Sequence, residues 1–223
     1  MTARFEMTAV SMKREYGPTL GHLLAPRWRA ASGLARAVVI ATAVGLVAVL
    51  VAAGLTLENA HYSHGGRVPF SFSYRDLYRV PPDPGGFVKV QSHWPNGALK
   101  YSYAVDPVTL PAYSGELAGE IPLYATSFIR TLGSRYQHFE LRGEGKARVN
   151  NMLTGYQVLF TADVEGETMY GRDVLLMPSR AAVREGVVVA MLTSPTASAQ
   201  VTAPMEVGAT GVLLRPLKTF AFG

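Results

Sequence analysis

Val187-Val188-Val189-Ala190-Met191-Leu192 is a run of six apolar residues with no polar residue among them. A strand with one solvated face alternates apolar and polar residues, whereas a strand covered on both faces is apolar throughout. The run is therefore typical of a strand in the middle of a sheet. We expect Gly186–Thr193 to be that central strand, with the other elements arranged around it.

The segments before this strand also have strand patterns. Phe70–Tyr74 alternates strictly between aromatic and serine residues, and Pro95-Asn96-Gly97 is a turn signal between two alternating runs. Glu165-Gly166 is a second tight-turn signal farther along the chain. The strands predicted in this part are Phe70–Tyr74, Phe87–Gln91, Leu99–Val105, Phe139–Val149, Gly155–Val164 and Thr168–Met177.

Two segments have helical spacing. Ile121, Ala125 and Leu132 lie on one side of a helix that begins near Pro122. Residues 205–217 repeat the spacing more weakly, because glycines interrupt them. This order of elements predicts an α+β fold, an antiparallel sheet of six to seven strands packed against two helices. We expect the helices to cover one side of the sheet in a two-layer or three-layer sandwich.

Ala37–Leu57 is an uncharged, apolar stretch of 21 residues. As a helix it spans roughly 31 Å at about 1.5 Å per residue, which matches a bilayer hydrocarbon core of about 30 Å. Arginines lie before it within residues 27–36, and Glu58 follows it. The positive-inside bias then places the N-terminus in the cytoplasm. We expect one transmembrane helix, with the lipid bilayer as its partner.

These signals divide the chain into four parts. Residues 1–36 are predicted to be a basic, mostly flexible cytoplasmic head, and residues 37–57 the transmembrane helix. Residues 58–65 then form a tether, and residues 66–223 an extracytoplasmic domain at the cell membrane. A cleaved signal peptide is the alternative. Val51-Ala52-Ala53 has the form of a cleavage site, but it lies inside an apolar run longer than the usual 7–15 residues.

Composition excludes several classes of protein. The head carries six basic and two acidic residues, whereas residues 58–223 carry 15 basic and 14 acidic residues. A domain so nearly balanced lacks the basic face of a nucleic-acid binder. The chain has no cysteine, which excludes disulfides, thiolate metal sites and cysteine nucleophiles. We find no motif for a catalytic centre, a cofactor or a metal, and predict none of them.

Short patterns along the outer domain form a recognisable series. They are Val68–Tyr74, Gly155–Val158, Tyr170–Asp173 and Lys218–Phe222, with the predicted helix between the first and the second. The series resembles the PsbP-like α/β sandwiches, which include the photosystem II extrinsic subunit, a Ran-binding protein and membrane-anchored envelope proteins of actinobacteria. The resemblance covers about residues 66–223. It implies a binding or assembly module, and it carries no catalytic residues across.

Tyr170-Gly171-Arg172-Asp173 is the first place that suits ligand binding. These residues interrupt an otherwise apolar strand. In a regular strand Arg172 and Asp173 point to opposite faces, so at least one charge faces inward and needs a partner. The alternative is a structural pair that ties the strand to a neighbour such as Arg148 or Glu167. We regard Tyr170, Arg172 and Asp173 as candidate binding residues.

His93 and Trp94 are the second such place. They lie beside the predicted turn at Pro95-Asn96-Gly97 and form an aromatic loop tip. Residues exposed on loops are used in binding more often than others. A tryptophan that caps the core is the alternative reading of the same pattern.

These observations lead to one expectation of function and two alternatives. We expect a non-catalytic, single-pass, extracytoplasmic binding or assembly module with a protein partner in the cell envelope. Alternatively, the sandwich encloses a small apolar ligand or lipid between its helix and its sheet. A hydrolase is the third reading. It requires a cleft in which His93 or His138 meets a carboxylate within hydrogen-bond reach.

Overall fold

The computed structural model describes residues 32–33, 37–38, 40–42, 44–46, 60–111, 117–150, 153–178 and 184–223. The chain divides into two compact units, Met1–Leu57 and Glu58–Gly223.

The described residues of the first unit are helical except for Ser32. The Thr42 hydroxyl donates to the carbonyl of Val38 over 2.9 Å, a bond back to its own helix. In the parts of the chain that the structure describes, no helix is long and apolar enough to cross a membrane. Most of Ala37–Leu57 and nearly all of residues 1–36 lie outside those parts, so the anchor and the head stay predictions. Four apolar side chains within the described part of the stretch are more than half exposed, namely Val38, Ile40, Val44 and Leu46.

The second unit is built on an antiparallel sheet of seven strands, in the order β3-β4-β5-β9-β8-β7-β6. The strands β3 to β5 form consecutive hairpins at one edge. The chain then crosses through α3 (Leu117–Arg135) to the far edge, and β6 to β9 return strand by strand to the middle. The strands are β3 (Tyr78–Val80), β4 (Val88–His93), β5 (Leu99–Thr109), β6 (Gln137–Val149), β7 (Leu153–Val164), β8 (Glu167–Leu176) and β9 (Glu185–Thr193).

The apolar run in β9 is the central strand, as its sequence predicts. It lies fourth in the order of seven and pairs with β5 on one side and β8 on the other. Val187 and Val189 belong to one core of the protein, and Val188 and Leu192 belong to the other. Both faces of this strand are therefore covered.

A second sheet covers one face of the first. It has three strands in the order β1-β2-β10, which are Ala60–His64, Phe70–Tyr74 and Ala221–Phe222. The helix α4 (Leu214–Thr219) and the short helix η1 (Pro204–Glu206) lie in the same layer. The aromatic residues of β2 face inward, and Phe72 packs on Tyr103 of β5 with 4.9 Å between ring centroids. Ala60–His64, part of the stretch assigned above to the tether, is thus a strand of the folded unit.

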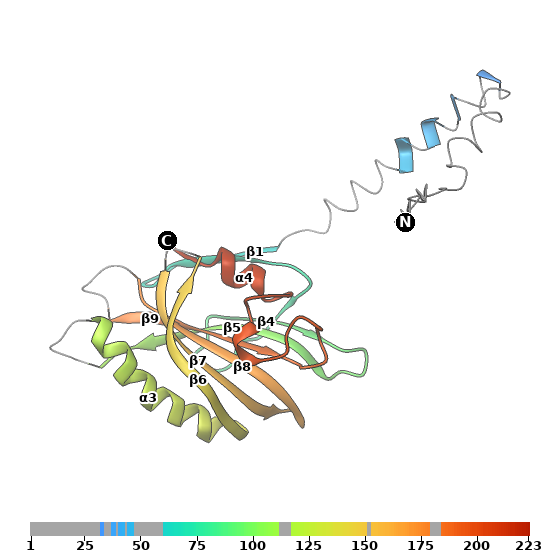
Figure 1. Ribbon diagram of the computed structural model, residues 1–223. Coiled ribbons are helices and arrows are strands. Elements are labelled where there is room, and N and C mark those ends of the chain that lie inside the picture. The colour runs from blue at the N-terminus through green and yellow to red at the C-terminus, as the bar shows by residue number, and fades with distance from the viewer. Residues whose placement is uncertain are drawn as a thin grey trace, which may run out of the picture. The chain divides into compact units, whose positions relative to one another are not determined.

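The expectation that both helices cover one side of the sheet is wrong. α3 packs on one face, where Leu132 meets a core with Phe160 and Met169. α4 packs on the other, where Leu217 belongs to the core shared with the small sheet. Figure 1 shows the two helices on opposite sides of the strands. The result is a three-layer α+β sandwich, because a central strand that is apolar on both faces needs cover on both.

The weak helical spacing of residues 205–217 does not produce one helix. Gly208 and Gly211 adopt positive φ angles of 73° and 68°, which end η1 and separate it from α4. A side chain at Gly208 would meet the Met191 sulfur at 2.8 Å. The backbone there lies close against β9, and this approach brings the segment after η1 onto the sheet.

Candidate functional site

Arg172 lies in β8, where successive side chains point to opposite faces of the sheet. Val174 and Leu176, two and four residues farther on, belong to the core under the small sheet. Arg172 shares their face and is only 9% exposed. Its side chain is therefore enclosed between the large sheet and the layer that carries α4.

The guanidinium of Arg172 is incompletely bonded. One terminal nitrogen donates to the backbone carbonyl of Val207 over 3.0 Å, while the buried Nε has no hydrogen-bond partner among the residues that the structure describes. Among the described residues, Arg172 forms no ion pair. Burial lowers the pKa of this guanidinium, but arginine remains a cation in proteins. The structural pair with a neighbouring strand is therefore not what holds this residue.

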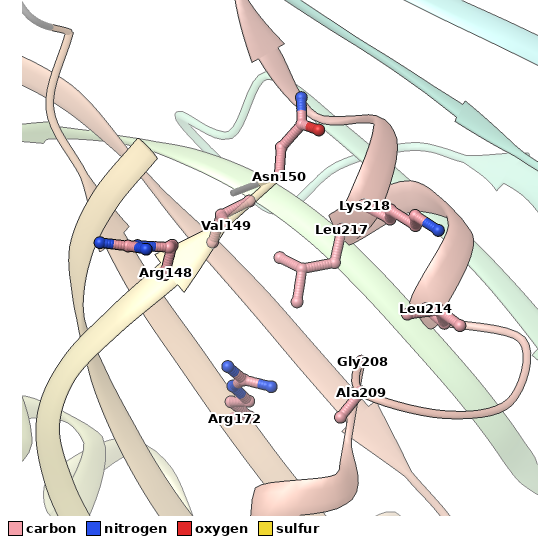
Figure 2. A pocket seen from close by; sticks show the side chains of 9 residues that line it. All are labelled: Arg148, Val149, Asn150, Arg172, Gly208, Ala209, Leu214, Leu217 and Lys218. Carbon is pink, nitrogen blue, oxygen red and sulfur yellow. The ribbon is translucent and has the colours of Figure 1, made fainter. Parts of the chain in front are cut away.

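Arg172 lines a pocket of about 400 Å³ that lies between β6, β8 and α4. Three of the lining side chains are basic and none is acidic. Figure 2 shows Leu217 pointing from α4 into this space, whereas Lys218 points outward from the same helix. We call this feature the basic pocket. Its lining residues are Arg148, Val149, Asn150, Arg172, Gly208, Ala209, Leu214, Leu217 and Lys218.

The walls of the basic pocket come from segments far apart in the sequence. Arg148 and Asn150 lie at the end of β6, where Val149 between them is buried. The Asn150 amide donates to the carbonyl of Phe220 over 3.2 Å and ties this end of β6 to the residue after α4. The positive φ of Asn150, 52°, marks the turn that ends the strand.

The acidic residue near the basic pocket is Glu206 at the end of η1, and its carboxylate is already hydrogen-bonded. The carboxylate of Glu206 accepts hydrogen bonds from the backbone amides of Thr202 and Ala203 and from the Thr202 hydroxyl. The bond from the Thr202 amide is the main cause that holds the pKa of Glu206 below its usual value. Glu206 therefore holds its own loop and does not neutralise the basic pocket.

Asp173 lies on the opposite face of the sheet and is 2% exposed. Burial raises its pKa to about 8, against the opposing effects of Arg135 and of a hydrogen bond from the Met191 backbone amide. The nearby Asp106 raises it further. The carboxyl group is consequently protonated at neutral pH, which removes the cost of burying a charge.

A polar cluster lies near Asp173 at the end of α3. Arg135 forms an ion pair with Asp83 over 2.6 Å, and Lys89 contacts the other oxygen of Asp83 over 3.1 Å. Burial raises the pKa of Asp106, and Arg135 opposes that effect. These side chains neutralise one another. Within the described residues no group of three or more histidines and carboxylates could hold a metal.

The hairpin predicted around Pro95-Asn96-Gly97 is present, and His93 and Trp94 beside its turn are half-buried. These two residues do not line the basic pocket. Trp94 and Ala98 close the β4–β5 hairpin through a backbone hydrogen bond of 2.8 Å. The ammonium of Lys100 lies over the Trp94 ring, 4.2 Å from its centroid, and His93 bonds the hydroxyl of Tyr78. This hairpin belongs to β4 and β5, whereas Arg172 belongs to β8. Tyr170 shares the face of Arg172 and packs half-buried against the core of that side.

A histidine and a carboxylate do meet within hydrogen-bond distance. His138 Nδ1 lies 2.7 Å from an oxygen of Asp163, whose other oxygen accepts from the Thr168 hydroxyl. The His138 side chain is 80% exposed. Because this pair lies on the surface and the hydroxyl bonds the aspartate instead of the histidine, it lacks the arrangement of a nucleophile with its base.

The sequence indicates Arg172 as a candidate binding residue and Arg148 only as a structural partner, and it does not indicate Asn150 or Lys218. Arg148 alternates with buried residues along an exposed strand edge, and Lys218 lies on the outer side of α4. Both patterns are those of ordinary solvated charges. The signal in the sequence is Arg172 itself, a charge within an otherwise apolar strand.

Comparison with known proteins finds weak similarity to solved structures. Neither the models of protein families nor the curated proteins provide a match to this chain. Among solved structures, the Ran-binding protein Mog1p of Saccharomyces cerevisiae matches with a TM-score of 0.45 and 12% identity, over 74% of this chain and 95% of that one. A protein of unknown function from Pseudomonas aeruginosa matches with a TM-score of 0.32 and 9% identity, over 59% and 86%.

Proposed function

We propose that this chain is a membrane-tethered, extracytoplasmic binding module that holds an anionic group of an envelope partner in the basic pocket. The observation that carries the proposal is Arg172, a buried cation whose Nε has no hydrogen-bond partner within the described part of the chain. A buried donor left unsatisfied costs about 1–3 kcal/mol, and more when it belongs to a charged group. An anion from a partner supplies the countercharge that the described residues do not supply.

The role is one of binding and not of catalysis. The pocket combines cations with apolar carbon atoms, a lining that orients and retains a ligand. Its polar lining residues are arginine, lysine and asparagine. None of these is a nucleophile beside an oriented base, the pair on which covalent catalysis depends. The PsbP-like resemblance of the sequence also implies a binding or assembly module.

Site-specific photo-crosslinking in intact cells tests this role. A photoreactive residue replaces Leu214, which is 38% exposed and lines the pocket, and a matched control replaces Tyr78, which is 51% exposed on β3. We expect an adduct from position 214 that disappears when Arg172→Gln is added, and no such adduct from position 78. An adduct at 214 that is equally strong with Arg172→Gln would contradict the proposal.

The membrane tether is the second part of the proposal. The exposed apolar side chains Val38, Ile40, Val44 and Leu46 suit a lipid environment, since large apolar surfaces of water-soluble proteins are rarely uncovered. Alkaline extraction of membranes should leave the chain in the pellet. Protease added outside intact spheroplasts should remove residues 58–223. Release of the chain by alkali would contradict the anchor.

A small apolar ligand is a second candidate, favoured by another pocket. That pocket has a volume of about 230 Å³ and is lined in part by Val68, Phe87 and Val108. The His64 ring lies over Phe87 with 4.3 Å between centroids, and the ion pair of Arg67 with Glu185 lies beside it. Native mass spectrometry of the full chain from detergent should then show an additional bound mass, and a spectrum of the protein mass alone would contradict this reading.

A further inference from the structure

The chemistry of the basic pocket indicates which anion it takes. Resting on the proposed function, we infer that the ligand is a carboxylate attached to an apolar group. The reasons are the single buried cation among the lining residues, the shortage of other buried donors and the apolar side chains that face the cation.

Arg172 is the buried cation of the pocket, while Arg148 and Lys218 are exposed. A planar guanidinium matches a planar carboxylate, which can accept two parallel hydrogen bonds from it. One buried positive charge calls for one negative charge at the same depth. The exposed cations at the rim are screened by salt and act at longer range, where they steer an anion toward the opening.

The donors of the neighbouring backbone are largely in use. The amides of Ala209 and Thr210 both donate to the carbonyl of Glu206, over 2.9 and 3.1 Å. The Asn150 amide is engaged with Phe220. A phosphate has three strong acceptor oxygens and a charge of about −1.5 to −2, whereas the buried cationic donors at the depth of Arg172 belong to a single guanidinium. A carboxylate has two oxygens, and Arg172 can satisfy both.

The wall opposite the guanidinium is apolar. Val149 is 1% exposed and Leu217 is 5% exposed, and Leu214 leaves 38% of its surface uncovered at the rim. The volume of about 400 Å³ lies toward the small end of ligand pockets, which span roughly 300–1,000 Å³. A branched aliphatic group next to the carboxylate would cover the exposed surface of Leu214 and contact Leu217, which points into the pocket (Figure 2). Such a group occurs in short carboxylic acids and at the C-terminus of a peptide that ends in leucine.

Calorimetric titration of the full chain in detergent micelles at low salt tests the inference. The probes are 4-methylpentanoate, N-acetyl-leucine, N-acetyl-leucine amide, acetate and inorganic phosphate. We expect 4-methylpentanoate and N-acetyl-leucine to bind at least tenfold more tightly than acetate or phosphate, and the amide to show no binding. A tetrapeptide ending in leucine that binds more tightly than the free acids identifies a peptide terminus as the source, and the reverse order identifies a free acid.

Three variants give the test its controls. Arg172→Gln should weaken the carboxylates at least tenfold, and Arg172→Lys should weaken them severalfold because it keeps the charge but loses the fork. Arg130→Gln on α3 removes the same charge from the opposite layer and should leave binding unchanged. Circular dichroism confirms that each variant folds, and Arg172→Lys keeps the test decisive should Arg172→Gln not fold.

The outcomes separate the two ideas. If phosphate binds most tightly and its binding depends on Arg172 in the same way, the inference of a carboxylate ligand is overturned, whereas the proposed function stands. The absence of any anion effect that depends on Arg172 overturns both. If carboxylates bind equally well to all three variants, the anion binds outside the basic pocket, and this result overturns both the carboxylate inference and the proposed function.

Discussion

Arg172 and Asp173 are consecutive residues of β8 with opposite charges, yet they are buried in different cores of the protein, 9% and 2% exposed. The alternation of the strand sends them to opposite faces, so neither can neutralise the other. Asp173 becomes neutral because burial raises its pKa to about 8. Arg172 cannot become neutral in the same way, because arginine keeps its proton. This difference leaves an uncompensated cation on the side of the sheet that faces the basic pocket.

The first prediction concerns the pH dependence of stability. The pKa of Asp173 is about 8 in the folded protein, against an ordinary value of 3.8. Between these values the folded state holds a proton that the unfolded state has lost, so the free energy of unfolding falls as pH rises from about 4 to 8. The slope from this group reaches about 1.4 kcal/mol per pH unit and vanishes above pH 8.

Asp173→Asn removes this slope. Urea unfolding of the variant and the native chain at half-unit pH steps should give difference curves that diverge from pH 4 to 8 and then run parallel. Asp163→Asn is the control, because bonds from Thr168 and His138 lower the pKa of Asp163, so its contribution is lost only as pH falls below the ordinary value of 3.8. Between pH 4 and 8 this variant should keep the slope of the native chain. Identical slopes for the Asp173→Asn variant and the native chain would contradict the assignment.

The second prediction is that Arg172 contributes little to stability. Arg172→Met removes a charge-assisted hydrogen bond to Val207, worth about 1.5–3 kcal/mol, and also removes a buried unsatisfied donor that costs about 1–3 kcal/mol. These terms nearly offset each other. We expect the free energy of unfolding to change by less than about 1 kcal/mol. A loss of about 3–5 kcal/mol, the range for breaking a buried ion pair, would identify Arg172 as a structural residue.

The third prediction concerns Glu120, a buried charge that, unlike Arg172, forms an ion pair. Glu120 of α3 is 3% exposed and accepts a bond of 2.8 Å from Arg184. Arg184→Met leaves that carboxylate without this countercharge. We expect a loss of about 3 kcal/mol, the lower end of the range for breaking a buried ion pair, because the Arg184 side chain is 38% exposed. Glu120→Gln should lose less, because a neutral amide replaces the buried charge. Urea midpoints of the two variants measure the difference, and an equal loss would show that the pair acts through packing.

Much of the fold follows from apolar patterns, and the limits of that reasoning are physical. The unbroken run in β9 identifies a strand covered on both faces, and the two tight-turn signals locate hairpins, because these patterns are local. The same run demands cover on both sides of the sheet. The small sheet of β1, β2 and β10 could not be predicted as a layer, because β1 lies in a short polar stretch and β10 has only two residues, Ala221 and Phe222.

Within the basic pocket, only the most deeply buried cation, Arg172, could be predicted from the sequence as a binding residue. A charge within an apolar strand indicates that Arg172 is exceptional, and the alternation shows that Asp173 faces elsewhere. The basic pocket also needs Arg148, which is brought opposite α4 when the end of β6 is tied to Phe220 through Asn150. No local pattern encodes a contact between residues separated by 70 positions in the chain.

The fourth prediction concerns the stability effect of replacing Gly171, the residue before Arg172. Gly171 pairs with Phe160 of β7, and a side chain at this position would meet the Phe160 ring at 2.3 Å. Gly171→Ala therefore forces the ring away from the core beneath α3, and overpacking of this kind costs about 1–3 kcal/mol. Gly143→Ala is the matched control on β6, because the added carbon would lie at an ordinary 3.7 Å from Leu159. Thermal unfolding of both variants should show a clear loss for Gly171→Ala only, and an unchanged midpoint there would mean that Phe160 moves aside freely.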